Sequence, residues 1–492
     1  MKRSKLFNIF SAKIFALILL ITISMPGCDW FSSGSDSDDE NGGQPDEVTK
    51  TAWSKTYGHG DTYTEYHAYG FDATGDGGYV FASQNVYNGA GGYDFWIVRL
   101  NSEGSLVWEK GFGGENGEEP FVVRQTSDGG FIAAGESWSF RTGTSYCDAW
   151  VIKLSVSGGV EWQRSYGGTG VDAFSDVKET FDSNGDSTGF LLCGNTNSFG
   201  SGGYDAWIVK INTSGLITHE EVIGGSQNEF GRSVALTSDG GCILLADTQS
   251  FGAGNRDVWL VKLDSSYSVE WEKAYGGTDV DFPRTVVCSG DGGYVVGSYT
   301  ESFGAGENDY WILKVDSDGD IVWQYTYGGT DGDIAYDLQK TNDGGYIMTG
   351  WTYSFGAGFN DAWLVKLNGS GVIQWQKRYN ITYTDGTDTW SGSDWAYRVI
   401  QTADGGYAIA GDSDDVVAVR NGDAWIFRVD STGTLGCDMA ADTDAVGNGT
   451  ATVTVTDTSG DSVMSSTSAN VDSTSASGYS ASPEVITQCD VQ

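Results

Sequence analysis

The sequence contains little proline, histidine or positive charge. Its 492 residues include 5 Pro, 3 His and 27 Lys and Arg against 67 Asp and Glu, and the formal net charge is −40. Nucleic-acid binding relies on Lys and Arg that neutralise phosphates, so this balance argues against a nucleic-acid partner. A surface this negative favours a soluble monomer and attracts divalent cations loosely, so we expect no cofactor beyond loosely bound calcium.

Catalytic motifs are also missing. No HExxH, nucleophile elbow or phosphate loop occurs, and the histidines are His59, His67 and His219. Acidic pairs are so abundant that any two carboxylates could be nominated as general acid and base, so the pattern singles out none. The sequence therefore favours a protein that is not an enzyme, and it predicts no catalytic residue.

Only one long hydrophobic run is present, FALILLITI at 15–23, and it follows the basic residues Lys2, Arg3 and Lys5. A basic start followed by a short apolar stretch is typical of a secretory signal, and the run is too short to span a membrane. We therefore expect residues 1–27 to be a signal peptide.

The next segment, MPGC (25–28), resembles the lipobox of bacterial lipoproteins, with Met25 where that motif usually has Leu. By this resemblance Cys28 is lipidated. The protein would then be exported and held by its lipid anchor alone on the periplasmic or cell-surface side of a bacterial membrane. An ordinary signal peptide is the alternative. Residues 28–50 are acidic and polar and predict a flexible tether.

Glycine and tryptophan, by contrast, are abundant, with 72 Gly and 18 Trp, and they recur in seven units. Each unit reads W…YGG…D, then T-x-DGGY, then SFGAG…D-x-W-x-x-K, then D-x-x-G, so the chain is a repeat protein. The units start at Trp53, Trp108, Trp162, His219, Trp271, Trp323 and Trp375. The D-x-W-x-x-K/R elements start at Asp94, Asp148, Asp205, Asp257, Asp309, Asp361 and Asp423.

Each unit contains four short β-like runs, which one unit shows at 284–289, 294–299, 310–315 and 320–327. Four strands per unit at this period are typical of a propeller blade. We therefore expect an all-β fold, a seven-bladed β-propeller of four-stranded blades, over residues 51–436.

The ends of the repeat predict how the ring closes. A fourth-strand pattern, TAWSKTYG (51–58), precedes any first strand, and no Trp-bearing fourth strand follows the last third strand at 423–429. The N-terminal strand at about 51–58 should therefore close the last blade and cover its edge. The alternative is ATVTVTD (451–457) from the Ser/Thr-rich tail, 437–492, in which we expect at most a hairpin.

The pattern GG…D…G…D-x-x-x-K-x-x-x-G resembles the SBBP type of β-propeller repeat found in secreted bacterial proteins. The element KLD-x-x-G-x-x-W is similar to the Trp-docked blades of quinoprotein-like propellers. The resemblance covers about residues 51–436. It implies the fold and no particular activity, because such propellers serve many functions.

One turn has the spacing of a calcium loop, with Asp316, Asp318 and Asp320 alternating. The equivalent turns of the other units usually share only Asp or Asn first and Gly fourth, as a tight hairpin requires. No downstream Glu completes a calcium loop. The segment is therefore interpreted as a turn, and no metal ligand is predicted.

Seven cations and seven carboxylates recur at fixed places, and we expect them to form structural ion pairs within or between blades. A ring of ligand-binding cations is the alternative. The cations are Arg99, Lys153, Lys210, Lys262, Lys314, Lys366 and Arg428. The carboxylates near the start of strand one are Glu65, Glu118, Asp172, Glu229, Asp281, Asp333 and Asp394.

Two candidate binding sites follow from departures from the repeat. Irregular loops at 57–65, 379–395 and 412–423 should meet where blades 7 and 1 adjoin, although drift at terminal repeats explains them equally well. The candidates there are His59, Asp61, Trp390, Asp414, Asp415 and Arg420. The second site is the channel mouth, where core filling is the alternative. Its candidates are Phe121, Ser175, Arg232, Arg284, Tyr336 and Tyr397.

Setting Cys28 aside, the cysteines suggest one disulfide. Cys437 and Cys489 bracket the tail and are expected to staple its end to the propeller. Three others in strands are expected to be buried thiols, with a pair between adjacent blades, Cys242 and Cys288, left open. The three are Cys193, Cys242 and Cys288. Cys147 is expected near the surface.

These observations favour a lipid-anchored, exported propeller that acts as a binding or scaffolding module for a protein or cell-envelope partner. A lectin-like carbohydrate binder is the second hypothesis, since aromatic residues and carboxylates are frequent in the loops. A polysaccharide lyase or glycosidase is the third.

Overall fold

The computed structural model describes residues 52–58, 67–85, 91–141, 146–355, 359–384, 389–414, 423–435, 450–457, 463–466 and 470–472. All of them belong to the compact unit Val48–Gln492. Within these residues, no helix is both long and apolar enough to cross a membrane.

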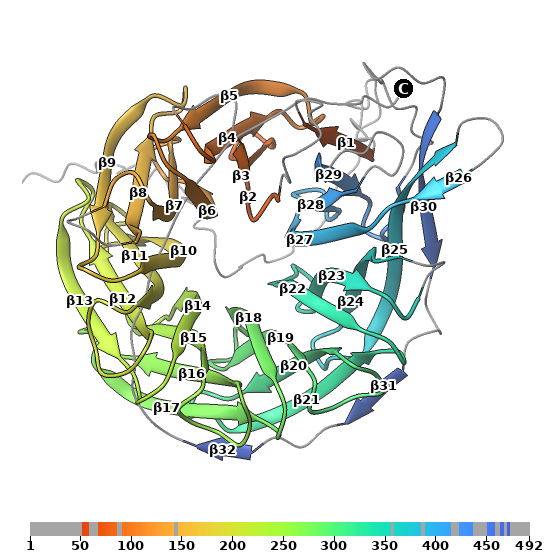
Figure 1. Cartoon of the computed structure of the whole chain (residues 1–492). Helices are drawn as coiled ribbons and strands as arrows, with labels where there is room; N and C mark the ends of the chain where they lie inside the picture. Colours follow the sequence, from red (N-terminus) through yellow and green to blue (C-terminus); the bar gives the residue numbers. More distant parts are fainter. Residues whose placement is uncertain are drawn as a thin grey trace, which may run out of the picture. The chain divides into compact units, whose positions relative to one another are not determined.

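Seven antiparallel sheets stand in a ring, each with its first strand at the centre, so the fold is the expected seven-bladed, all-β propeller (Figure 1). The first, innermost strands are β2 (Gly70–Ala73), β6 (Glu118–Gln125), β10 (Asp172–Phe181), β14 (Glu229–Leu236), β18 (Asp281–Cys288), β22 (Asp333–Lys340) and β27 (Asp394–Gln401). The second strands are β3 (Tyr79–Asn85), β7 (Phe131–Ser137), β11 (Ser187–Thr196), β15 (Cys242–Thr248), β19 (Tyr294–Thr300), β23 (Tyr346–Thr352) and β28 (Tyr407–Ser413).

The outer half of each blade repeats in the same way. The third strands are β4 (Asp94–Leu100), β8 (Asp148–Leu154), β12 (Asp205–Ile211), β16 (Asp257–Leu263), β20 (Asp309–Val315), β24 (Asp361–Leu367) and β29 (Asp423–Val429). The fourth strands are β5 (Leu106–Phe112), β9 (Val160–Tyr166), β13 (Ile217–Ile223), β17 (Val269–Gly276), β21 (Ile321–Gly328), β25 (Ile373–Thr384) and, in blade 7, β1 (Trp53–Tyr57).

The ring closes as the sequence predicts. Strand β1 pairs antiparallel with β29, from Trp53 opposite Arg428 to Tyr57 opposite Ala424. The alternative closing strand is wrong: β30 (Thr450–Asp457) pairs with β25 of blade 6 instead.

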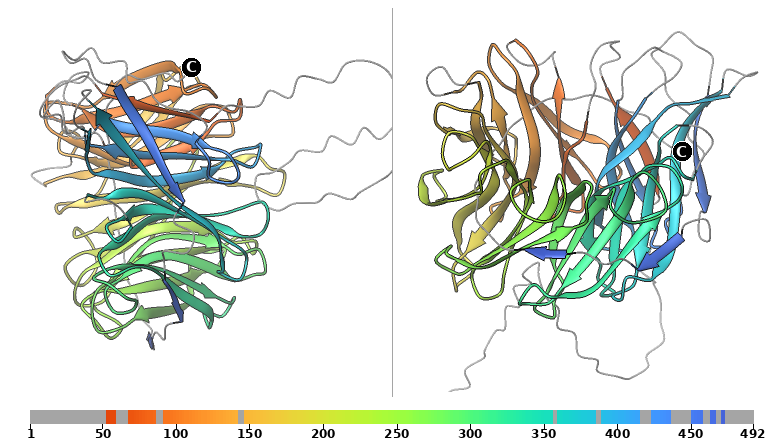
Figure 2. Two further views of the ribbon diagram at one scale, coloured as in Figure 1. Left: turned by 90° about the vertical axis from the view of Figure 1, so that its right-hand side faces the viewer. Right: turned by 60° about the horizontal axis from the view of Figure 1, so that its bottom comes forward.

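Three described segments of the tail form strands, where we expected at most a hairpin. After β30, β31 (Val463–Ser466) pairs with β21 of blade 5, and β32 (Asn470–Asp472) pairs with β17 of blade 4. These dark blue strands lie on the outer rim in both figures of the ring (Figures 1 and 2). Each adds a strand to an exposed sheet edge, which would otherwise present unpaired backbone groups.

The repeated tryptophans have two structural roles. Those of the D-x-W element are at most 1% exposed and fill the space between blades: Trp96, Trp150, Trp207, Trp259, Trp311, Trp363 and Trp425. Those of the fourth strand dock on the next blade's D-x-x-G turn. Trp271, for example, donates its indole N–H to the carbonyl of Ser317 at 3.0 Å. Gly319 of that turn has a φ of +80°, and a Cβ there would lie 2.9 Å from the Trp271 ring. The turn containing Asp316 is therefore a docking hairpin, and its carboxylate accepts backbone N–H groups at 2.9 and 3.0 Å.

One blade interface departs from this docking. His219 replaces the tryptophan of blade 3, and Tyr267 replaces the turn glycine of blade 4 that it faces. Their rings lie 5.1 Å apart. Tyr267 has a φ of +63° and is the one non-glycine residue with positive φ in the described part of the chain. The two changes therefore meet at a single contact.

The cysteines differ from expectation at two points. Cys147 is buried rather than near the surface, and Cys288 is half-buried. In the described part of the chain these two cysteines form no disulfide, nor do Cys193 and Cys242, so the alternative pair between Cys242 and Cys288 is wrong. The remaining cysteines lie outside the described residues: Cys28, Cys437 and Cys489.

Candidate functional site

A β-bulge interrupts the inner strand of six blades at the same repeat position. In blade 5, Pro283 lies opposite Ser298 and Thr285 opposite Gly297, so Arg284 between them has no partner in the register. A bulge leaves one extra residue and redirects its side chain. The bulged residues are Phe121, Ser175, Arg232, Arg284, Tyr336 and Tyr397. They are the channel-mouth candidates of the sequence analysis.

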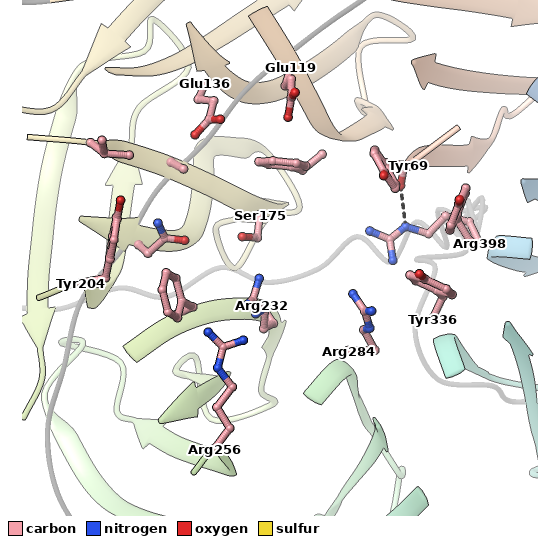
Figure 3. A pocket seen from close by; sticks show the side chains of 16 residues that line it. Tyr69, Glu119, Glu136, Ser175, Tyr204, Arg232, Arg256, Arg284, Tyr336 and Arg398 are labelled. Atoms are coloured by element: carbon pink, nitrogen blue, oxygen red, sulfur yellow. Dashed lines mark hydrogen bonds between the residues drawn. The ribbon is translucent and has the colours of Figure 1, made fainter. Parts of the chain in front are cut away.

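All six line one pocket with a volume of about 730 Å³ at the centre of the ring (Figure 3). Tyr69, directly before β2, lines it too and supplies the residue of blade 1. Sequence reasoning missed Tyr69 because it compared the bulge position in blades 2 to 7 only, although Tyr69 precedes Asp76 by the same interval as Arg284 precedes Asp291. It also missed lining residues outside the bulge position, including Glu119, Glu136, Arg256 and Arg398.

Polar contacts next to the bulges tie neighbouring inner strands together. Arg124 of blade 2 lies 3.2 Å from the carboxylate of Asp176 in blade 3, and that carboxylate accepts the N–H of Val234 in blade 4. On the other side of the ring, Asp337 of blade 6 accepts the hydroxyl of Thr285 at 2.9 Å and the N–H of Val399 at 3.1 Å. These charges have partners in the scaffold, so they explain channel packing rather than binding.

One wall of the pocket is cationic. Arg232 and Arg256 share the buried carboxylate of Asp247, with Nε–Oδ distances of 2.6 and 3.3 Å. Both guanidinium groups also lie over the ring of Phe230, at 5.2 Å from its centroid. The neighbouring Arg398 donates its Nε–H to the carbonyl of Tyr69 at 2.8 Å.

Arg284 stands among aromatic rings on the same wall. Its guanidinium lies 4.3 Å from the ring centroid of Tyr336, 4.7 Å from that of Phe282 and 5.5 Å from that of Tyr299. Its buried Nε has no hydrogen-bond partner among the described residues. Burial lowers the pKa of Arg284, and the nearby Arg232 and Arg398 lower it further.

The opposite wall, on blade 2, is acidic. Glu119 and Glu136 lie directly opposite each other on β6 and β7. Burial, and then the charge of Glu119, raise the pKa of Glu136 to about 8. A hydrogen bond from the Cys147 thiol, with a sulfur–oxygen distance of 3.6 Å, acts in the opposite direction and lowers this pKa. Burial also raises the pKa of Glu119, which His67 opposes. With this pKa the Glu136 carboxyl would be mostly protonated at neutral pH, and its side chain lies at the pocket (Figure 3).

The other candidate site, where blades 7 and 1 adjoin, lies largely outside the described residues, including His59, Asp61, Asp415 and Arg420. Trp390 belongs to the short strand β26 (Thr389–Ser391) and pairs with Tyr383 of β25. Asp414 donates its backbone N–H to Ser393 at 2.8 Å.

The repeated cations are ion-paired, but not with the expected carboxylates. Lys262 binds Asp239 of the DGG hairpin at 2.8 Å and Glu270 at 2.9 Å. The other pairs are Arg99–Asp76, Lys153–Asp128, Lys314–Asp291, Lys366–Asp343 and Arg428–Asp404. Lys210 instead lies against the hydroxyls of Thr180 and Thr188.

Strand direction explains this correction. Neighbouring strands are antiparallel, so the first and third strands of a blade run in the same direction and end on the same side. The cation lies near the end of the third strand, whereas the carboxylate lies at the start of the first strand, on the opposite side of the blade. The carboxylates there accept hydrogen bonds from loop residues: Asp281 accepts the N–H of Gly277 at 2.6 Å and the hydroxyl of Ser302 at 2.8 Å. The corresponding residues are Glu118, Asp172, Glu229, Asp333 and Asp394. Glu65 lies outside the described residues.

The architecture and the central pocket define the chain as a seven-bladed β-propeller. No protein-family model matches its sequence, and no curated protein does. Among solved structures, polysaccharide lyase Uly1 is 10% identical over 78% of this chain and 98% of its own, with a TM-score of 0.41. Sqt1 from Chaetomium thermophilum is 8% identical over 75% and 97%, with a TM-score of 0.38. Endo-1,5-alpha-L-arabinanase from Thermotoga petrophila RKU-1 is 11% identical over 73% and 97%, with a TM-score of 0.31.

Proposed function

We propose that the protein is a binding module whose ligand enters the pocket at the centre of the propeller. One observation carries the proposal. The bulged residue of each blade from 2 to 7, together with Tyr69 of blade 1, lines a single cavity. A volume of about 730 Å³ is within the range of ligand pockets, which are roughly 300–1,000 Å³.

The variation among these positions supports binding rather than core filling. The D-x-W tryptophans that fill the space between blades are the same residue in all seven units. The bulged residues instead comprise Phe, Ser, Arg and Tyr, and they stay partly exposed apart from Tyr397. A cavity with one cationic wall, one acidic wall and aromatic residues between them offers an asymmetric site for one ligand.

We favour a saccharide of the cell envelope as the ligand, because flat aromatic side chains and hydrogen-bonding groups line the same cavity. The proposal assigns binding and no catalysis. It includes the expected export and lipid anchoring at Cys28, which would hold the monomeric propeller at a membrane surface where such ligands occur. The loop that enters blade 7 is a second candidate surface, for a protein partner, because β25 of blade 6 is extended to 12 residues and pairs with β26.

A glycan array with the full-length protein tests the proposal. The variant Ser175→Trp would fill the pocket from its centre, whereas Val156→Trp adds the same side chain at a position that is 67% exposed. We expect the unmodified protein and Val156→Trp to bind the same glycans and Ser175→Trp to bind none. Binding that survives Ser175→Trp, or an array without any bound glycan, would contradict the proposal.

A further inference from the structure

We propose that this pocket selects an anionic ligand, whose carboxylate or sulfate group is held by Arg284 together with Arg232. The inference rests on the proposed function and names the class of its ligand. It is carried by a charge imbalance on one wall of the cavity.

The pocket concentrates a residue type that is scarce in the chain. Four of its 12 arginines line the cavity: Arg232, Arg256, Arg284 and Arg398. Among the described residues, their one ion-pair partner is Asp247, which Arg232 and Arg256 share. The wall therefore carries a surplus of positive charge in a protein with a net charge of −40.

The structural cations of the same chain provide the comparison. Arg99 lies 2.5 Å from the carboxylate of Asp76, and Arg428 pairs with Asp404 in the equivalent place. At this repeat position, each arginine is paired with the carboxylate of a DGG hairpin. Arg284 has only aromatic rings within its described contacts, and removing a charge from water without a counter-charge is unfavourable.

A bound oxyanion would supply the missing charge. Arg232 and Arg284 both line the cavity, and the guanidinium group of each lies 4.7 Å from the ring centroid of Phe282. A guanidinium presents N–H groups in a planar fork that matches the two oxygens of a carboxylate or sulfate. Stacking on Tyr336 and Phe282 fixes the plane of the Arg284 fork before the ligand arrives.

The acidic wall restricts the rest of the ligand. A charged Glu119 would repel a second anionic group on this wall, so the charge must lie at one end of the ligand only. The protonated Glu136 can donate a hydrogen bond to a hydroxyl at the other end. A sugar that carries a single acidic group has this arrangement.

The test compares probes that differ only in charge. Binding of D-glucuronate, D-glucose 6-sulfate, D-glucose and sodium sulfate to the full-length protein would be measured by ligand-observed NMR at constant ionic strength. We expect both acidic sugars to bind at least tenfold more tightly than D-glucose. If sodium sulfate also binds, the result supports a general oxyanion site. If the acidic sugars bind and sodium sulfate does not, the result identifies an acidic saccharide as the ligand.

Two variants complete the experiment. Arg284→Gln should lower the affinity for D-glucuronate at least tenfold, and the outer-edge variant Arg164→Gln should leave it unchanged. Without ligand, Arg284→Gln should be as stable as the unmodified protein or more stable, because it removes a half-buried cation that has no ion-pair partner among the described residues. If it is less stable, Arg284→Lys, which keeps the charge and loses the fork, should still show weaker binding. Equal binding of glucose and glucuronate, abolished by Ser175→Trp, would overturn the inference and leave the proposed function intact. Absence of binding by every probe would overturn the inference, and the glycan array then decides the proposed function separately.

Discussion

The contact between His219 and Tyr267 provides a quantitative test of how the blades dock. At the six other interfaces a Cβ at the turn glycine would lie 2.7–3.1 Å from the docked tryptophan ring, so a tryptophan and a side chain at the turn exclude each other. We predict that His219→Trp is destabilising alone and is rescued by Tyr267→Gly.

The expected sizes follow from the geometry. In His219→Trp, overpacking against Tyr267 and an introduced indole N–H that is held away from the turn carbonyl together cost about 2 kcal/mol. In Tyr267→Gly, relief of the left-handed backbone, about 1–2 kcal/mol, is offset by the greater chain entropy of unfolded glycine and by the lost ring contact, each about 1 kcal/mol. The double variant should seat its tryptophan as the other interfaces do. The coupling energy is therefore about 2 kcal/mol in favour of the double variant.

Equilibrium urea unfolding followed by far-UV circular dichroism measures the four free energies of the cycle, since an added tryptophan would disturb fluorescence. The next interface provides the matched control. Trp271→His with Gly319→Tyr should reproduce the His–Tyr contact, and Gly319→Tyr alone should be the least stable of that set. Single effects that add within about 0.5 kcal/mol in both cycles would refute mutual exclusion.

Three further predictions concern charge. Lys262→Met should lower the free energy of unfolding in urea by about 1 kcal/mol. Asp239→Asn should lower it more, because the buried ammonium group of Lys262 then keeps only Glu270 as an ionic partner. The reverse order would refute the structural role of the pair. Burial raises the pKa of Asp257 to about 6, so its stabilising contribution, present below about pH 4, is lost as the pH rises through 6. Unfolding at pH 4.5 and 7.5 should therefore show a decrease in stability that is smaller for Asp257→Asn by about 2 kcal/mol. Affinity for D-glucuronate should fall as the pH rises through 8, where Glu136 ionises beside Glu119, and Glu136→Gln should remove that step.

Much of the fold could be predicted because seven similar units report on one structure. A single unit leaves its strands ambiguous, but the alignment of DGG, SFGAG and D-x-x-G across units fixes where each strand ends. The closure by Trp53–Tyr57 followed from counting fourth strands. The strands of the tail could not be predicted, because 463–466 and 470–472 are short polar segments whose partners are blade edges distant in sequence.

The ion pairs show a limit of the repeat argument. A cation and a carboxylate that recur in every unit must lie at a fixed distance, but their recurrence does not say that the distance is short. The directions of the strands would have excluded the pairing of Lys262 with a first-strand carboxylate, because the two lie at opposite ends of a blade. The DGG aspartate, Asp239 in blade 4, recurs in six of the seven units and lies at the correct end.

The candidate site was predictable only in part for a related reason. The bulged position could be found as a place where the units differ, and this gave Arg232 and Arg284. The residues beside them could not be found in that way: Asp247, on the second strand of blade 4, meets Arg232 only in the folded chain, and Arg256 lines the cavity from a loop.

The structure also explains why charge at the bulge is more informative than charge elsewhere in this acidic chain. At the third-strand position the repeat provides both the cation and the DGG aspartate that pairs with it. A substitution in one unit therefore leaves the ion pairs of the other units intact. The bulge position is different, because most units hold Ser, Phe or Tyr there and the repeat supplies no carboxylate for an arginine. Arg232 acquired a partner in Asp247, whereas Arg284 has none among the described residues. A cation at that position without a scaffold partner is available to bind an anion, as we propose for this pocket. We therefore expect the loss of Arg284 to lower ligand affinity more than it lowers stability.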